Sequence, residues 1–228
     1  LNLARSDSFP LRLRWGWGND LAGARLTAPL PGGGALDVRS GYTRFDTDIR
    51  FPDFADTELR ARIGHFQVRA DADLRPGAGL AVRVGAEANR KRYDNLAESG
   101  GTTFGVGRDA GWLTGAWVQA AWRPGPRWLD EAGARVDHWA PGRGAAVTEP
   151  APRAAVKHFF AGGDAAVKLA AGRYTQFVHS LRDEELPLGI DVWVLSGARA
   201  PHVVSDQAQA GVEAFLPHGW YAAAEAYY

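Results

Sequence analysis

Apolar and polar residues alternate with a period of two along most of the chain. Between Leu80 and Ala88 the even positions are apolar, whereas Arg83 and Glu87 occupy odd positions. The same alternation runs through residues 132–137 and 206–216. A period of two puts the two sets on opposite faces of a β-strand, whereas helical side chains repeat every 3.6 residues. The pattern therefore predicts an all-β protein whose strands each have an apolar and a polar face.

Ten segments alternate strongly enough to be predicted as strands, and residues 9–17 are a candidate eleventh. Several are longer than the 5–6 residues common in soluble sheets, and a tilted strand that crosses an outer membrane needs about 9–11 residues. The ten predicted strands are residues 21–30, 35–49, 57–74, 79–93, 110–123, 127–139, 152–161, 164–179, 205–216 and 219–228.

The connections between these strands are predicted to alternate between short and long. The short ones are rich in Pro and Gly, which favour tight turns; they are residues 31–34, 76–78, 124–126, 162–163 and 217–218. The long ones are residues 50–56, 94–109, 140–151 and 180–204. Outer-membrane barrels have short periplasmic turns and longer outer loops. The chain is therefore predicted to be an antiparallel up-and-down transmembrane β-barrel.

Aromatic residues and small apolar residues agree with this prediction. Trp112 and Trp122 lie toward opposite ends of one predicted strand and share its apolar parity, while Trp139 has the opposite parity. Aromatic side chains form girdles at both interfaces of outer-membrane barrels. The apolar positions are mostly Ala and Val, and a surface that faces lipid needs no interdigitating core.

Composition narrows the possible functions. The formal net charge is zero, which gives no electrostatic case for nucleic acid. The absence of cysteine excludes disulfides and thiolate catalysis. No apolar run approaches the roughly 18 residues of a membrane-spanning helix. Because the sequence also lacks methionine, including at Leu1, we do not expect it to be a complete translation product: either a signal was removed or the piece begins internally.

Residues 152–228 resemble the barrel of TonB-dependent outer-membrane receptors. A strand ending in Gly172-Arg173-Tyr174 leads into a long loop, the next strand begins with Ser205-Asp206-Gln207, and a hairpin then leads to Glu225-Ala226-Tyr227-Tyr228. The resemblance also involves residues 152–157, 168–185, 191–193, 196–197 and 219–221, and an earlier hairpin matches at residues 15–21 and 41–49.

The resemblance implies a function in the bacterial outer membrane. It implies active uptake of a scarce nutrient, such as an iron–siderophore, cobalamin or a glycan, with outer loops 94–109 and 180–204 capturing the substrate. Outer-membrane lipid, the nutrient and the TonB complex would be the partners, the last through a plug region that is missing here. The family's barrel has about twice as many strands. Residues 1–228 are therefore expected to form part of a single barrel domain, as an open or partial barrel without a plug.

Two sets of site residues are predicted. Charged and aromatic residues of the last long loop are candidates for substrate binding, although a solvated outer loop is the simpler interpretation; they are His179, Arg182, Asp183, Glu184, Glu185 and Trp193. Polar residues of the opposite parity to the apolar face are predicted to face the lumen; they are Arg83, Glu87, Gln119, Glu131, Arg135, Lys168, Gln207, Gln209, Glu213 and Glu225.

No catalytic residue, metal ligand set or cofactor site is predicted. Hydrolase, nucleotide and zinc motifs are absent, and the six histidines have no ligand spacing. The chain is therefore not expected to be an enzyme. A passive porin or structural outer-membrane protein of about ten strands, ending at the aromatic Tyr228, is the main alternative. An outer-membrane hydrolase and a soluble β-sandwich are further alternatives.

Overall fold

Ten strands form one antiparallel sheet. Their order in the sheet follows their order along the chain. The structure is a computed structural model that describes residues 12–181 and 192–228. The sheet runs β1 (Arg14–Leu30), β2 (Gly34–Phe51), β3 (Thr57–Gly77), β4 (Leu80–Ser99), β5 (Thr102–Gly125), β6 (Trp128–Pro141), β7 (Val147–Phe160), β8 (Ala165–Gln176), β11 (Val203–Leu216) and β12 (Trp220–Tyr227).

The remaining elements are small. β9 (Val178–Leu181) and β10 (Val192–Leu195) form a separate two-stranded hairpin between β8 and β11. Two single-turn 3₁₀ helices, η1 (Ala161–Gly163) and η2 (Pro217–Gly219), connect β7 to β8 and β11 to β12. None of the helices in the described ranges is long and apolar enough to cross a membrane.

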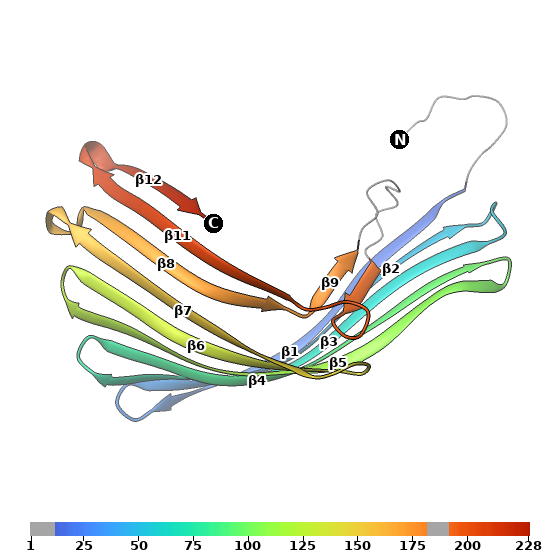
Figure 1. Cartoon of the computed structure of the whole chain (residues 1–228), viewed down its shortest axis with the longest axis horizontal. Helices are drawn as coiled ribbons and strands as arrows, with labels where there is room; N and C mark the ends of the chain where they lie inside the picture. Colours follow the sequence, from blue (N-terminus) through green and yellow to red (C-terminus); the bar gives the residue numbers. More distant parts are fainter. Residues whose placement is uncertain (1–11, 182–191) are drawn as a thin grey trace.

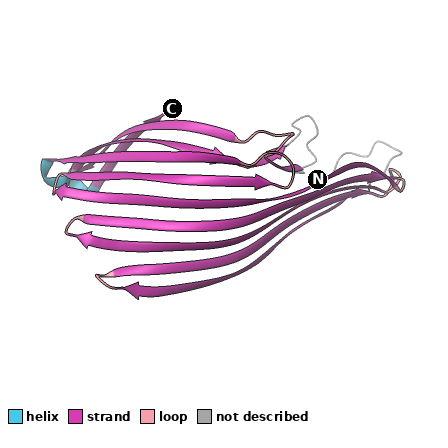
Figure 2. Cartoon of the chain, turned by 60° about the horizontal axis from the view of Figure 1, so that its bottom comes forward, coloured by secondary structure: helices cyan, strands magenta, loops and turns pink. Residues whose placement is uncertain are grey.

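The sheet is curved and does not close on itself. β1 and β12 are its two edges, and each pairs with a single neighbour. Figure 1 shows an open trough with β9 on the inner side of the curve, and Figure 2 shows the long strands running side by side. The all-β, antiparallel, up-and-down prediction is therefore confirmed, as an open part of a barrel.

One end of the sheet carries the predicted Pro/Gly turns, which we call the turn end. It lies at the left of Figure 1 and includes both 3₁₀ turns. Gly32 and Gly33, between β1 and β2, have φ angles of 77° and 79°. Only glycine adopts this conformation without strain, so the sequence correctly predicts a tight turn here. The opposite end of the sheet is called the loop end.

The strict alternation of short and long connections is wrong. Residues 94–109 are not a loop, because β4 continues to Ser99, β5 begins at Thr102, and only Gly100 and Gly101 lie between them. The predicted connections 50–56 and 140–151 shorten to residues 52–56 and 142–146. Charged side chains interrupt the apolar pattern in these segments, but backbone pairing continues past the apolar part of each strand. Only the connection from β8 to β11 is long.

Two other boundaries also change. Residues 14–17 of the predicted segment 9–17 and the whole predicted segment 21–30 belong to one strand, β1, and residues 1–11 lie outside the described ranges. β7 begins before its predicted start and pairs with β6 from Val147, but with β8 only from Arg153. Pro150 and Pro152 cannot donate hydrogen bonds, which explains why β7 lacks a partner on the β8 side along this stretch.

The strand register separates alternate positions of every strand onto two faces that are continuous over the whole sheet. Odd positions of β1 to β7 share a face with even positions of β8 and odd positions of β11 and β12. This is called the polar face, and the other the apolar face. Leu26, Val118, Val136, Leu169 and Val212 on the apolar face are 46–66% exposed. These large aliphatic side chains come from strands across the whole sheet. Such a broad exposed apolar surface is expected where a barrel contacts lipid.

Candidate functional site

The centre of the polar face is a charged network that joins three strands. Arg135 of β6 donates to Glu87 of β4 at 2.5 Å and to both carboxylate oxygens of Asp137 at 2.8 and 2.9 Å. Gln67 of β3 donates to Glu87 at 2.9 Å. Glu87 and Arg135 are two strands apart, so their side chains reach across β5.

Glycine on β5 makes this reach possible. A Cβ atom at Gly115 would lie 2.5 Å from an Arg135 guanidinium nitrogen and 2.6 Å from a carboxylate oxygen of Asp137. Such distances are shorter than van der Waals contact, so a side chain at Gly115 would displace the ion pairs. The network therefore needs a glycine at this register position.

Trp117 of β5 lies between two arginines of the polar face. Its ring centroid is 4.3 Å from the Arg69 guanidinium carbon and 5.0 Å from that of Arg135. Arg69 also donates to Asp71 at 2.7 and 2.9 Å. These geometries give cation–π contacts together with charge-assisted hydrogen bonds. Sequence analysis missed Arg69 and Trp117, although both have the polar-face parity that identifies them.

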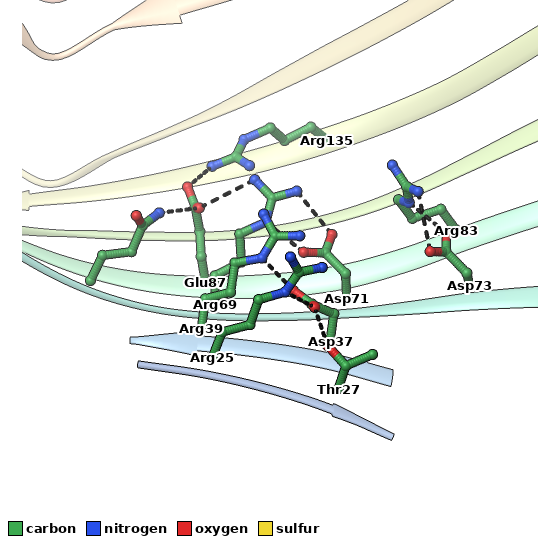
Figure 3. Close-up of polar contacts among 11 residues, drawn as sticks. Arg25, Thr27, Asp37, Arg39, Arg69, Asp71, Asp73, Arg83, Glu87 and Arg135 are labelled. Atoms are coloured by element: carbon green, nitrogen blue, oxygen red, sulfur yellow. Dashed lines mark hydrogen bonds and ion pairs between the residues drawn. The ribbon is translucent and has the colours of Figure 1, made fainter. Parts of the chain in front are cut away.

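The network continues toward the turn end through Asp37 of β2. Asp37 is 7% exposed and accepts hydrogen bonds from Arg25 at 2.5 Å, from Thr27 at 2.9 Å, and from Arg39. Figure 3 shows this cluster, the Glu87 cluster and the Arg83–Asp73 pair as sticks. Because each acid of these clusters has a basic partner, this part of the face is densely charged but locally neutralised.

A second set of ion pairs crosses the strands near the β12 edge. Lys157 of β7 pairs with Glu213 of β11, and Lys168 of β8 pairs with Glu225 of β12. Gln209 donates to Glu225 at 3.0 Å. Both ion pairs bridge next-neighbouring strands, as the Arg135–Glu87 pair does, whereas the Gln209–Glu225 hydrogen bond joins neighbouring strands.

The register puts all ten residues predicted to face the lumen on the polar face. Seven of them take part in the ion pairs and hydrogen bonds described above; they are Arg83, Glu87, Arg135, Lys168, Gln209, Glu213 and Glu225. The other three lie on the same face, on β5, β6 and β11; they are Gln119, Glu131 and Gln207. That this face lines a lumen stays a prediction.

The hairpin of β9 and β10 covers the polar face near the loop end, with β10 against β3, β4 and β5. Trp139 of β6 donates from its indole nitrogen to the Ser196 carbonyl at 2.8 Å, and Asn95 of β4 donates to the Trp193 carbonyl at 2.8 Å. Trp139 also stacks on Phe177 at 5.6 Å between centroids. Trp139, Phe177 and Leu195 are at most 5% exposed, so they form a small apolar core under the hairpin.

The predicted substrate-binding residues have mixed outcomes. His179 hydrogen-bonds the Ser196 hydroxyl at 3.0 Å and half-buried Trp193 lies on β10, so both belong to the docked hairpin. Ser196 is 2% exposed, so this hydrogen bond is buried within the docked hairpin. The other four predicted residues lie outside the described ranges; they are Arg182, Asp183, Glu184 and Glu185. Ligand binding by any of the six stays a prediction.

No protein-family model and no curated protein matches the sequence. Solved structures do match. The copper transporter OprC superposes with a TM-score of 0.71 at 15% identity, over 94% of this chain. The ferripyoverdine receptor of the outer membrane of Pseudomonas aeruginosa gives 0.55 at 11% identity over 91%, and the siderophore receptor PirA from the same organism gives 0.54 at 11% over 93%.

These likenesses establish the fold. The chain spans 39–46% of the length of these three proteins, which are transporters and receptors rather than enzymes. The resemblance to TonB-dependent receptors found in the sequence is thus confirmed for the fold, with the chain corresponding to part of such a barrel. This fold, with its exposed apolar face, is that of a bacterial outer-membrane protein.

Proposed function

We propose that the chain is part of the barrel of a TonB-dependent receptor that actively takes up a scarce nutrient. The observation that carries the proposal is the pairing of an exposed apolar face with a polar face cross-linked by charges and covered at one end by a docked hairpin. A lipid-facing wall accounts for the first face. A wide aqueous lumen accounts for the second, since water, a plug or a solute could contact the charged groups there.

The paired charges make the polar face suited to a lumen wall. Arg135 of β6 binds both Glu87 of β4 and Asp137, so it links β6 to β4 across β5. Arg83 and Lys168 lie on the same face, each paired with one carboxylate. In the proposed receptor these groups hydrogen-bond a plug region, through which the TonB complex acts.

The long connection between β8 and β11 is the proposed place of substrate capture. Its β9–β10 hairpin is held over the polar face near the loop end by Trp139 and Asn95. His179, Trp193 and residues 182–185 belong to this connection. Residues 94–109 form the β4–β5 hairpin and contribute a wall rather than a loop.

A metal or a metal chelate is the best supported class of substrate. The similar solved structures include a copper transporter and receptors for siderophores. Iron–siderophores come first among the candidates, followed by copper, cobalamin and glycans.

Uptake in cells with and without functional TonB tests this proposal. The complete reading frame is expressed in a strain lacking its own receptors, and accumulation of radiolabelled iron–siderophores, copper and cobalamin is measured. We expect accumulation of one substrate that stops when TonB is absent. Equal rates in both strains would instead indicate a passive porin.

A further inference from the structure

A band of arginines borders the apolar face at the loop end. The border begins with a row of paired residues across four strands, in which Tyr42 of β2, Phe66 of β3, Arg90 of β4 and Trp112 of β5 are consecutive partners. The three aromatic side chains are 42–43% exposed, and the Arg90 guanidinium is 5.6 Å from the Trp112 ring. Exposed aromatic residues mark the level of lipid headgroups on a membrane barrel.

Four more arginines lie on the same face just beyond this row. Arg44 and Arg92 occupy the next same-face row, and Arg62 and Arg108 the row after it. These five arginines, including Arg90, are called the arginine band. Strands are about 4.8 Å apart and rise about 3.4 Å per residue, so the band covers about 15 by 15 Å. That area accommodates more than one phosphate group.

The arginine band has more positive than negative charge. Its rows contain five arginines but three aspartates, Asp20, Asp46 and Asp94, which leaves an excess of two positive charges. Asp46 is shared by Arg44, at 2.7 Å, and Arg62, while Asp94 pairs with Arg108 at 2.9 Å. Arg90 and Arg92 are exposed and have no ion-pair partner in the described part of the chain.

The opposite border of the apolar face differs. At the turn end it carries exposed Trp122, Trp128 and Trp220, without a matching row of arginines in the described strands. Exposed aromatic residues are present at both borders and suffice to anchor a barrel in the membrane. The arginines are therefore an additional feature of the outward border, where guanidinium groups meet the outer leaflet.

We propose that the arginine band binds the phosphorylated headgroup of an outer-leaflet lipid. A guanidinium group donates two parallel hydrogen bonds to phosphate, and its alkyl stem can lie along the apolar face while the charge reaches the headgroup. The unpaired Arg90 and Arg92 supply the charges that the lipid phosphate neutralises. This site lies on the face opposite to the proposed lumen, so it is independent of the transported nutrient.

Lipid binding by charge-matched variants tests this proposal. The protein expressed from its complete reading frame is purified in a neutral detergent and titrated with diphosphorylated lipid A, and bound lipid is measured by native mass spectrometry. At about 1 kcal/mol per basic residue near an anionic lipid, R90Q/R92Q should weaken binding about thirtyfold. R90K/R92K keeps the charge but loses the two-pronged geometry, so its loss should be smaller.

The control removes two arginines of the same face outside the arginine band. R50Q/R173Q replaces side chains that already pair with Asp48, Glu58 and Asp206, and its lipid affinity should change less than twofold. Equal loss in both double variants, or no loss in R90Q/R92Q, would overturn the proposal. Inorganic phosphate is titrated in parallel; competition with lipid A at equal concentration would show a free-phosphate site and also overturn it.

Discussion

At the scale of single residues, the polar face depends on glycines that leave room for larger neighbours. A Cβ atom at Gly85 would lie 2.3 Å from the Trp117 ring and 2.8 Å from the Ala70 carbonyl oxygen. Trp117 can therefore lie over Gly85 of β4 and contact Arg69 and Arg135. A large side chain on one strand is thus matched to a missing side chain on the next.

Gly85→Ala should destabilise the protein by about 1–3 kcal/mol, because the methyl group forces Trp117 out of its position. The measurement is urea unfolding in lipid vesicles, followed by tryptophan fluorescence. Gly18→Ala on β1 is the matched control, since nothing lies within 4 Å of its Cβ position. Its effect should stay within about 0.5 kcal/mol. Equal effects of the two substitutions would contradict this account of Gly85.

Glu87 is the acid whose loss should matter most. Glu87→Gln leaves the half-buried Arg135 with only Asp137 as a charged partner, and we expect a loss of about 1–3 kcal/mol in the same unfolding experiment. Asp73→Asn breaks the exposed Arg83 pair and should cost less than about 1 kcal/mol. A larger loss of stability in Asp73→Asn than in Glu87→Gln would contradict this prediction.

The connection between β2 and β3 contains a pH-sensitive contact. Asp53 accepts hydrogen bonds from the Arg12 backbone at 2.8 Å and from its guanidinium at 2.9 and 2.6 Å, which lowers the Asp53 pKa. A lowered pKa means that the contact is fully present above the ordinary value of about 3.9 and is lost as the pH falls through the lower folded value. NMR titration of the Asp53 carboxyl should give a midpoint below 3.9 that rises in Arg12→Gln, and an unchanged midpoint would contradict it.

At the scale of elements, Trp139 is one of two side chains of the sheet, with Asn95, that hold the β9–β10 hairpin. Trp139→Ala removes both the hydrogen bond to Ser196 and the stack on Phe177, so amide hydrogen exchange in β9 and β10 should accelerate at least tenfold. Trp139→Phe retains the stack and should show an intermediate rate. Trp112→Ala, on the opposite face, is the control and should leave exchange in the hairpin unchanged. Acceleration in the control would mean that the effect is global.

At the scale of the whole molecule, the open sheet explains how the isolated chain should behave. β1 and β12 leave unpaired backbone groups at both edges, and the apolar face is exposed. Open strand edges pair readily with other chains and are not tolerated within the hydrocarbon layer. The sheet is therefore expected to need further strands to close a barrel.

Sedimentation in detergent tests this expectation. The 228-residue chain refolded alone should sediment as oligomers or aggregates, because its two edges pair between molecules. The product of the complete reading frame should sediment as a monomer under the same conditions. A stable monomer of the isolated chain would show that these strands can close by themselves.

The sequence by itself determined the faces, the turns at one end and the antiparallel order. These features are local, since alternation assigns each side chain to a face and Pro/Gly dipeptides reverse the chain. The same parity correctly grouped Glu87 and Arg135 on one face. It could not show that they bind each other, because that contact depends on the register of β4, β5 and β6 together.

Only the tertiary structure decided the length of the strands, the charge partners and the position of the hairpin. Residues 94–109 have no apolar alternation, so the sequence predicted a loop there. Pairing between β4 and β5 nevertheless continues to Ser99 and Thr102, because backbone hydrogen bonds do not depend on hydropathy. Trp139, whose parity differs from that of Trp112 and Trp122, is buried by Phe177 and Leu195 from a distant segment. Such contacts join residues far apart in the chain, so no local pattern predicts them.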